Sequence, residues 1–236
     1  MEPATAVQFG SPQFWVAGLQ IIVINILLSG DNAVVIALAC RNLSRRMRML
    51  GIFWGVMGAI VLRIVLTFFA VQLLQFPYLQ IVGALLLLWI GVKLIAEDDG
   101  GKANVKASDR LLAAIWTVIV ADLVMSLDNV IAVAAAAKGN LVLLVFGLVI
   151  SIPIVVLGAQ LVMKLMERFS WVIVAGGGLL GYLAGEIATH DTAVKPWVDT
   201  HAPLLHWIVP AVGIALVVGI GMWLVRRGKK AAASRG

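Results

Sequence analysis

Two stretches of the sequence place polar side chains inside apolar runs that are long enough to cross a bilayer. They read NILLSGDNAVVIALA over residues 25–39 and DLVMSLDNVIAVAAA over residues 122–136. An ionised aspartate at the centre of a membrane helix costs on the order of 3 kcal/mol. Each stretch therefore needs a bound cation, a basic side chain or a proton to compensate its carboxylate.

The two stretches repeat one pattern. With an offset of 97 residues, the pattern aligns Asn25 with Asp122, Ser29 with Ser126, Asp31 with Asp128, and Asn32 with Asn129. In a regular helix the first, second and fourth of these positions share one face. The aspartate at the third position lies off that face unless the helix unwinds, which Gly30 favours in the first copy.

The polar side chains of both copies are oxygen ligands of the carboxylate, amide and hydroxyl types. Such ligands suit Mg²⁺, Ca²⁺ or Mn²⁺ rather than copper or zinc. The candidate metal ligands are Asn25, Asp31, Asn32, Asp122, Asp128, Asn129 and Glu186. A purely structural interpretation is that they cap broken helices and hold helix pairs together. The duplication of the pattern favours a functional site.

Other residue types restrict the chemistry. The chain has one cysteine, Cys40, and no cluster of cysteine and histidine that could hold a soft metal, so we expect no tightly bound cofactor. Arg63 lies within an apolar run, where it either forms a salt bridge with Asp31 or Asp122 or serves as an internal cation that replaces metal in the empty site. Lys93 lies near a span end and is typical of a snorkelling residue.

The composition predicts an all-α polytopic membrane protein. Of the 236 residues, 62% are hydrophobic and 13% are charged, which is far more apolar than a soluble domain. Seven runs are long enough to span a bilayer. They are Phe14 to Ala39, Met49 to Leu73, Tyr78 to Ile95, Leu112 to Ala136, Leu141 to Val162, Trp171 to Ile187, and Leu205 to Val225.

The distribution of basic residues predicts the orientation. Of the 18 lysines and arginines, 14 fall in alternate loops and in the C-terminal tail, and only Lys138 and Lys195 fall on the other side. By the positive-inside rule, the N-terminus lies outside and the C-terminus is cytoplasmic. The net charge of +6 is explained in the same way, so we do not expect nucleic-acid binding.

The two polar stretches lie in spans of opposite direction, with three spans between their starts. This arrangement predicts two inverted three-helix repeats with a site between them near the midplane. Within one membrane domain over residues 1–236, we expect repeat one (14–95), a cytoplasmic loop (96–111), repeat two (112–187), an outer loop (188–204), a seventh helix (205–225) and a basic cytoplasmic tail (226–236).

At the two stretches quoted above, the sequence closely resembles the TerC family of integral membrane proteins, in particular its manganese-responsive branch. The segments GLVISIPIVVLGAQLV (147–162) and GYLAGE (181–186) are also similar to that family. The resemblance implies a multi-pass exporter of Mn²⁺ in the cytoplasmic (inner) membrane. It assigns Asp31, Asn32, Asp128 and Asn129 to the metal pathway, with Asn25, Asp122 and Glu186 as further positions.

Together these observations predict a secondary transporter, not an enzyme, that moves Mn²⁺ outward by alternating access. Protons are one candidate for the exchanged ion, because a proton can neutralise an empty carboxylate. The expected partners are a divalent metal ion and the lipid bilayer, with a homodimer left open. The alternatives are a carrier for Ca²⁺ or another small solute, an intramembrane aspartyl enzyme, and a metal sensor that does not transport.

Overall fold

A computed structural model describes residues 15, 16, 19, 30–73, 76–96, 106–137 and 141–233, and every regular element within these ranges is a helix. The elements are α2 (Gly30–Cys40), α3 (Arg45–Phe68), α4 (Ala70–Leu73), α5 (Leu79–Ala96), α6 (Ala107–Ala137), α7 (Leu141–Arg168), α8 (Trp171–His190), α9 (Lys195–His201) and α10 (Leu205–Ala233). The all-α prediction is confirmed for this part of the chain.

Six of the described helices are long and apolar enough to cross a membrane, namely α3, α5, α6, α7, α8 and α10. They correspond to six of the seven predicted spans. The remaining prediction, Phe14 to Ala39, lies largely outside the described residues, and its described part contains the shorter apolar helix α2.

Several helix boundaries differ from the predicted ones; α3 and α6, for example, begin four and five residues before the predicted starts, at Arg45 and Ala107. The second predicted span stops at Phe68 instead of continuing to Leu73, and the short α4 follows it. Near this break, the Thr67 hydroxyl donates a hydrogen bond to the Arg63 carbonyl, a contact that bends helices. Two helices continue beyond their predicted ends, α7 to Arg168 and α10 to Ala233. Most of the predicted basic tail is therefore helical.

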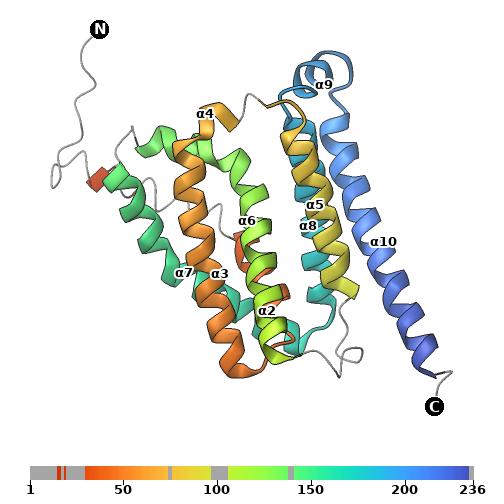
Figure 1. Cartoon of the computed structure of the whole chain (residues 1–236). Coiled ribbons are helices and arrows are strands. Elements are labelled where there is room, and N and C mark those ends of the chain that lie inside the picture. The colour runs from red at the N-terminus through yellow and green to blue at the C-terminus, as the bar shows by residue number, and fades with distance from the viewer. Residues whose placement is uncertain are drawn as a thin grey trace, which may run out of the picture.

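The helices pack in a pattern of pairs (Figure 1). Helix α3 lies along α6, α2 lies along α7, and α5 lies along α8, with α10 packed on both α8 and α5. Most side chains of α2 are buried, as expected of a helix that is apolar on all sides. Its apolar residues join the core with Ile52, Leu87, Leu148 and Leu180 from four neighbouring helices. Helix α2 therefore places its polar first turn inside the bundle.

Helices α8 and α10 approach each other closely through glycine. A Cβ atom added to Gly213 would lie 2.1 Å from the carbonyl oxygen of Gly181, and one added to Gly185 would lie 2.4 Å from the Cα of Pro210. Membrane helices associate through such close packing because lipid and apolar side chains are equally apolar. The contact holds α10 against the rest of the bundle.

The buried carboxylate of Asp191 fixes the end of α8 to the start of α5. Its oxygens accept hydrogen bonds from the backbone N–H groups of Tyr78 (3.0 Å), Gln80 (3.1 Å) and Ala193 (2.9 Å). The first turn of a helix has no internal acceptors for its N–H groups, and Asp191 supplies them from 110 or more residues away. Tyr78, just before α5, has a positive φ of 65°.

Replacement of Gly213 by alanine tests the contact between α8 and α10. The added methyl group has no room against a backbone oxygen, so we expect Gly213→Ala to lower the free energy of unfolding by about 1 to 3 kcal/mol. Gly219→Ala on the same helix is the matched control, because open space surrounds Gly219 and alanine favours helix by up to about 1 kcal/mol. Thermal unfolding of the purified protein measures both. Equal stability of the two variants would contradict the contact.

Candidate functional site

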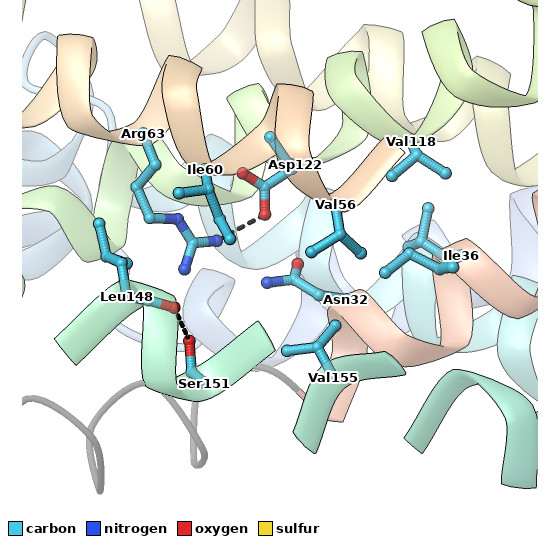
Figure 2. Close-up of a pocket in the computed structure, with 12 residues that line it drawn as sticks. Asn32, Ile36, Val56, Ile60, Arg63, Val118, Asp122, Leu148, Ser151 and Val155 are labelled. Atoms are coloured by element: carbon cyan, nitrogen blue, oxygen red, sulfur yellow. Dashed lines mark hydrogen bonds and ion pairs between the residues drawn. The ribbon is translucent and has the colours of Figure 1, made fainter. Parts of the chain in front are cut away.

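A small cavity of about 30 Å³ lies among α2, α3, α6 and α7. This volume is enough for one or two water molecules or a single ion stripped of most of its water. Four polar side chains line the cavity, one from each helix: Asn32, Arg63, Asp122 and Ser151. Valine, isoleucine, leucine and alanine side chains make up the rest of the wall (Figure 2).

A buried ion pair between α3 and α6 dominates the cavity. One terminal nitrogen of Arg63 donates to Asp122 Oδ1 at 2.5 Å, and Arg63 Nε donates to the Ser126 hydroxyl at 2.9 Å. That hydroxyl in turn donates to Asp122 Oδ2 at 3.1 Å, so both carboxylate oxygens accept hydrogen bonds. The side chains of Arg63 and Asp122 are only 7% and 9% exposed. The salt bridge predicted for Arg63 therefore forms with Asp122 rather than Asp31.

Small residues bring α3 close enough to α6 for this pair to form. A Cβ atom added to Gly58 would lie 2.5 Å from Ile119 Cδ1, and one added to Gly55 would lie 3.1 Å from Val118. These glycines lie on α3 five and eight residues before Arg63, and the residues they contact lie about one turn before Asp122 on α6. The close packing of α6 side chains against these glycines thus sets the reach of the guanidinium.

The first turn of α2 brings the first polar motif to the same cavity. The Asn32 side chain is buried and points into the cavity that Arg63 and Asp122 also line (Figure 2). Asp31 is half-buried, accepts a hydrogen bond from the Asn32 backbone N–H at 2.8 Å, and lies within electrostatic reach of Arg63 and Asp122. Residues 90 positions apart in the sequence therefore meet at one place.

The other predicted site residues either are not fully described by the structure or lie away from the cavity wall. Asn25 lies outside the described residues, and Asp128 and Asn129 belong to α6 but the placement of their side chains is not described. Glu186 is half-buried on α8, which contributes no residue to the cavity wall. Among the residues that the structure describes, no three histidine, cysteine, aspartate or glutamate side chains gather closely enough to hold a metal ion.

Ser151 is a cavity residue that the sequence interpretation missed. Its hydroxyl donates to the Leu148 carbonyl at 2.7 Å, two residues before Pro153 within α7. The available signal for this polar point in the cavity wall was a serine two residues before a proline in an apolar span.

The segment between α8 and α10 holds a separate charged group. Asp199 accepts hydrogen bonds from His206 at 2.7 Å and from Lys195 at 3.0 Å, and these contacts lower the pKa of the Asp199 carboxyl. The resulting stabilisation is present above the ordinary aspartate pKa and is lost as the pH falls through the lowered pKa. The group joins α9 to the start of α10 and lies outside the cavity wall.

Comparison with known proteins identifies the family. The sequence model of the family described as "Integral membrane protein TerC family" matches residues 10–230. The chain belongs to the TerC family. It is therefore a multi-pass integral membrane protein, in agreement with its six long apolar helices. No solved structure matches the chain.

Several relatives of this TerC protein come from bacteria. The chain is 40% identical to the "Uncharacterized membrane protein YjbE" of Bacillus subtilis over 200 residues, which cover 85% of this chain and 91% of that protein. It is 30% identical to "Uncharacterized membrane protein YceF" of the same organism over 58% of this chain and 57% of YceF. It is 25% identical to the "UPF0053 inner membrane protein YgdQ" of Escherichia coli over 66% of this chain and 73% of YgdQ.

Single and double substitutions test the ion pair in this TerC protein. We expect Asp122→Asn or Arg63→Gln alone to lower the free energy of unfolding by about 3 to 5 kcal/mol, because each leaves one buried charge without its partner. The double variant should recover most of that loss, since it leaves no buried charge. Thermal or denaturant unfolding in detergent measures the cycle.

Glu167→Gln is the control, because it removes a salt bridge that is exposed instead of buried. Glu167 pairs with Arg48 at the end of α7, where its side chain is 58% exposed. Removal of an exposed pair should change stability by less than about 1 kcal/mol. Double-variant stability no better than that of the single variants would show that Arg63 and Asp122 contribute independently.

Proposed function

We propose that this TerC protein is a divalent-metal transporter that exports Mn²⁺ across the cytoplasmic membrane by alternating access. The observation that carries the proposal is the convergence of the two polar motifs on one small cavity. Asn32 of the first motif and Asp122 of the second both line it, within the membrane-spanning bundle. Buried carboxylate and amide groups at that depth are typical of ion pathways.

The helix packing supports an inverted-repeat architecture for this carrier. In an inverted repeat, α2, α3 and α5 of the first half correspond to α6, α7 and α8 of the second half. A contact of α3 with α6 then requires a matching contact of α7 with α2, and both are present. The contact of α5 with α8 joins corresponding helices and is its own match. Transporters with such repeats bind substrate at the repeat interface near the midplane.

In the proposed topology, seven spans place the N-terminus outside and the C-terminus in the cytoplasm. Helix α10 stands outside the repeats and carries the basic residues of the C-terminal end. The start of α3 and the end of α10 lie at one end of the bundle, and α4 and α9 lie at the other end (Figure 1). The arginine-rich start of α3 then faces the cytoplasm together with the end of α10.

The ligand types favour a hard divalent ion. Asp122, Asn32 and Ser151 offer oxygen atoms around the cavity. Further oxygens would come from Asp31, Asp128, Asn129, Asn25 and Glu186 during the transport cycle. Hard oxygen ligands suit Mn²⁺, Ca²⁺ and Mg²⁺, and the family resemblance selects Mn²⁺ among them. Exchange with protons is the proposed coupling, because a proton can neutralise a pathway carboxylate such as Asp31 after the metal leaves.

A second candidate is a carrier for a small anionic or zwitterionic solute. One observation favours it, because the Arg63 guanidinium lines the cavity and could bind a carboxylate. The cavity volume argues against it, since about 30 Å³ accommodates an ion but small-molecule sites usually measure about 300 Å³ or more. An intramembrane aspartyl enzyme is disfavoured because Asp122 pairs with an arginine rather than with a second carboxylate.

Manganese efflux from cells that lack their own exporters tests the proposed function. We expect cells that express the parent protein to lower their manganese content, and Asp31→Asn and Asp128→Asn to reduce the efflux rate by roughly tenfold or more, because each removes a charged oxygen ligand. Asp109→Asn is the control, because Asp109 is an exposed carboxylate in the first turn of α6. Membrane levels of all variants must be equal.

Two outcomes would contradict the proposal at different points. Unchanged manganese in cells with the parent protein would refute Mn²⁺ as the substrate. Parent-like efflux by both aspartate variants would refute the role of the paired motifs. Efflux of an amino acid or another small organic solute in place of manganese would favour the second candidate.

A further inference from the structure

The Arg63 guanidinium is a positive charge in the cavity, and a carrier of cations must accommodate it. Asp122 is the buried carboxylate of the cavity. Both of its oxygens already accept hydrogen bonds, one from Arg63 and one from Ser126. The guanidinium is as deeply buried as the carboxylate. A divalent ion that reached Asp122 would therefore meet a fixed positive charge within contact distance of its ligand.

The arrangement does not let Arg63 and a metal ion share Asp122. Arg63 approaches from the cavity side and contacts Oδ1 directly, and the neighbouring Ser126 hydroxyl is held by both partners. Two positive charges at one carboxylate in a poorly screened interior repel each other strongly. Asp31 lies within electrostatic reach of the same guanidinium, so Arg63 weakens the attraction of a cation for both carboxylates.

We propose that Arg63 is the resident cation of the transport site, which neutralises Asp122 when the site is empty and competes with the transported divalent ion for that carboxylate. The inference rests on the proposed function and adds a specific role for one side chain. Metal binding requires the guanidinium to leave Oδ1, and departure of the metal lets it return. The empty carrier then presents a paired site to the bilayer interior, where an unpaired carboxylate is costly.

A competing role and a supporting role of Arg63 differ in their consequence for Mn²⁺ binding. If Arg63 only supports the fold or positions Asp122, its removal should weaken Mn²⁺ binding or leave it unchanged. If Arg63 competes for Asp122, its removal should tighten binding. The two roles therefore predict opposite directions for one measurement, which can be made on the intact chain without transport.

The test is a double-mutant cycle on Mn²⁺ affinity, measured by isothermal titration calorimetry on the full-length protein in detergent. We expect Arg63→Gln to lower the Kd for Mn²⁺ by about tenfold or more, because close charge pairs couple by amounts of at least this order. Arg63→Lys keeps a positive charge and should stay within about threefold of the parent. In the Asp122→Asn background, the same Arg63→Gln change should alter Kd by less than about threefold, because only the electrostatic effect of Arg63 on Asp31 remains.

The kinetics of transport give a second readout in liposomes loaded with Mn²⁺. Because tighter binding slows release, Arg63→Gln should lower both KM and the maximal rate. The double variant Arg63→Gln with Asp122→Asn keeps the measurement valid if the single variant unfolds, since it contains no unpaired charge at this position. Comparison of its Kd with that of Asp122→Asn alone then shows whether Arg63 acts through Asp122.

The outcomes separate this inference from the proposed function. If the parent binds Mn²⁺ but Arg63→Gln binds it no more tightly, Arg63 is not a competitor and the export function still stands. An equal tightening with and without Asp122 would also overturn the inference, because the competition would then involve another group. If the folded parent binds no Mn²⁺ at all, the proposed function and the competition fall together.

Discussion

The low polarity of the bundle interior is the constraint on which the arrangement of this protein depends. A charge there is tolerated only beside an opposite charge or a full set of hydrogen-bond partners. The pair of Arg63 and Asp122 meets this condition with Ser126 as a shared neighbour. Helix α3 can supply the arginine only because glycines let it approach α6 closely. The position of two spans is thus tied to one ion pair.

The remaining helices form a support for this centre. Helices α5, α8 and α10 pack together at the side of the bundle opposite α3 and α7 (Figure 1). Asp191 joins α8 to α5 through backbone N–H groups, and Gly181 and Gly213 bring α8 against α10. Neither contact depends on long side chains that change rotamer easily. We infer that these three helices keep their mutual arrangement while the cavity helices α2, α3, α6 and α7 provide the polar groups.

The sequence predicted those features that depend on residue type along one segment. Six apolar spans were recognisable because each is about 20 residues of nearly continuous apolar character. The duplicated motif identified Asn32 and Asp122 before the cavity that both residues line was visible. The choice of Asp122 over Asp31 as the partner of Arg63 was not predictable, because it depends on the rotation of α3 against α6. The Asp191 cap was equally hidden, since it joins residues that are 111 positions apart. The end of α3 at Phe68 was not predictable either, because the residues on both sides of the break are apolar.

The contact between α8 and α10 also has a consequence for how the protein is made. Helix α10 leaves the ribosome after every other described helix, and it covers the glycine face of α8. Until α10 arrives, that face can be occupied only by lipid chains, which cannot reproduce backbone packing at such short distances. The bundle can therefore complete its assembly only after the whole of the described chain has been inserted. This order gives membrane proteases a period in which a stalled or truncated chain can be distinguished from a finished one.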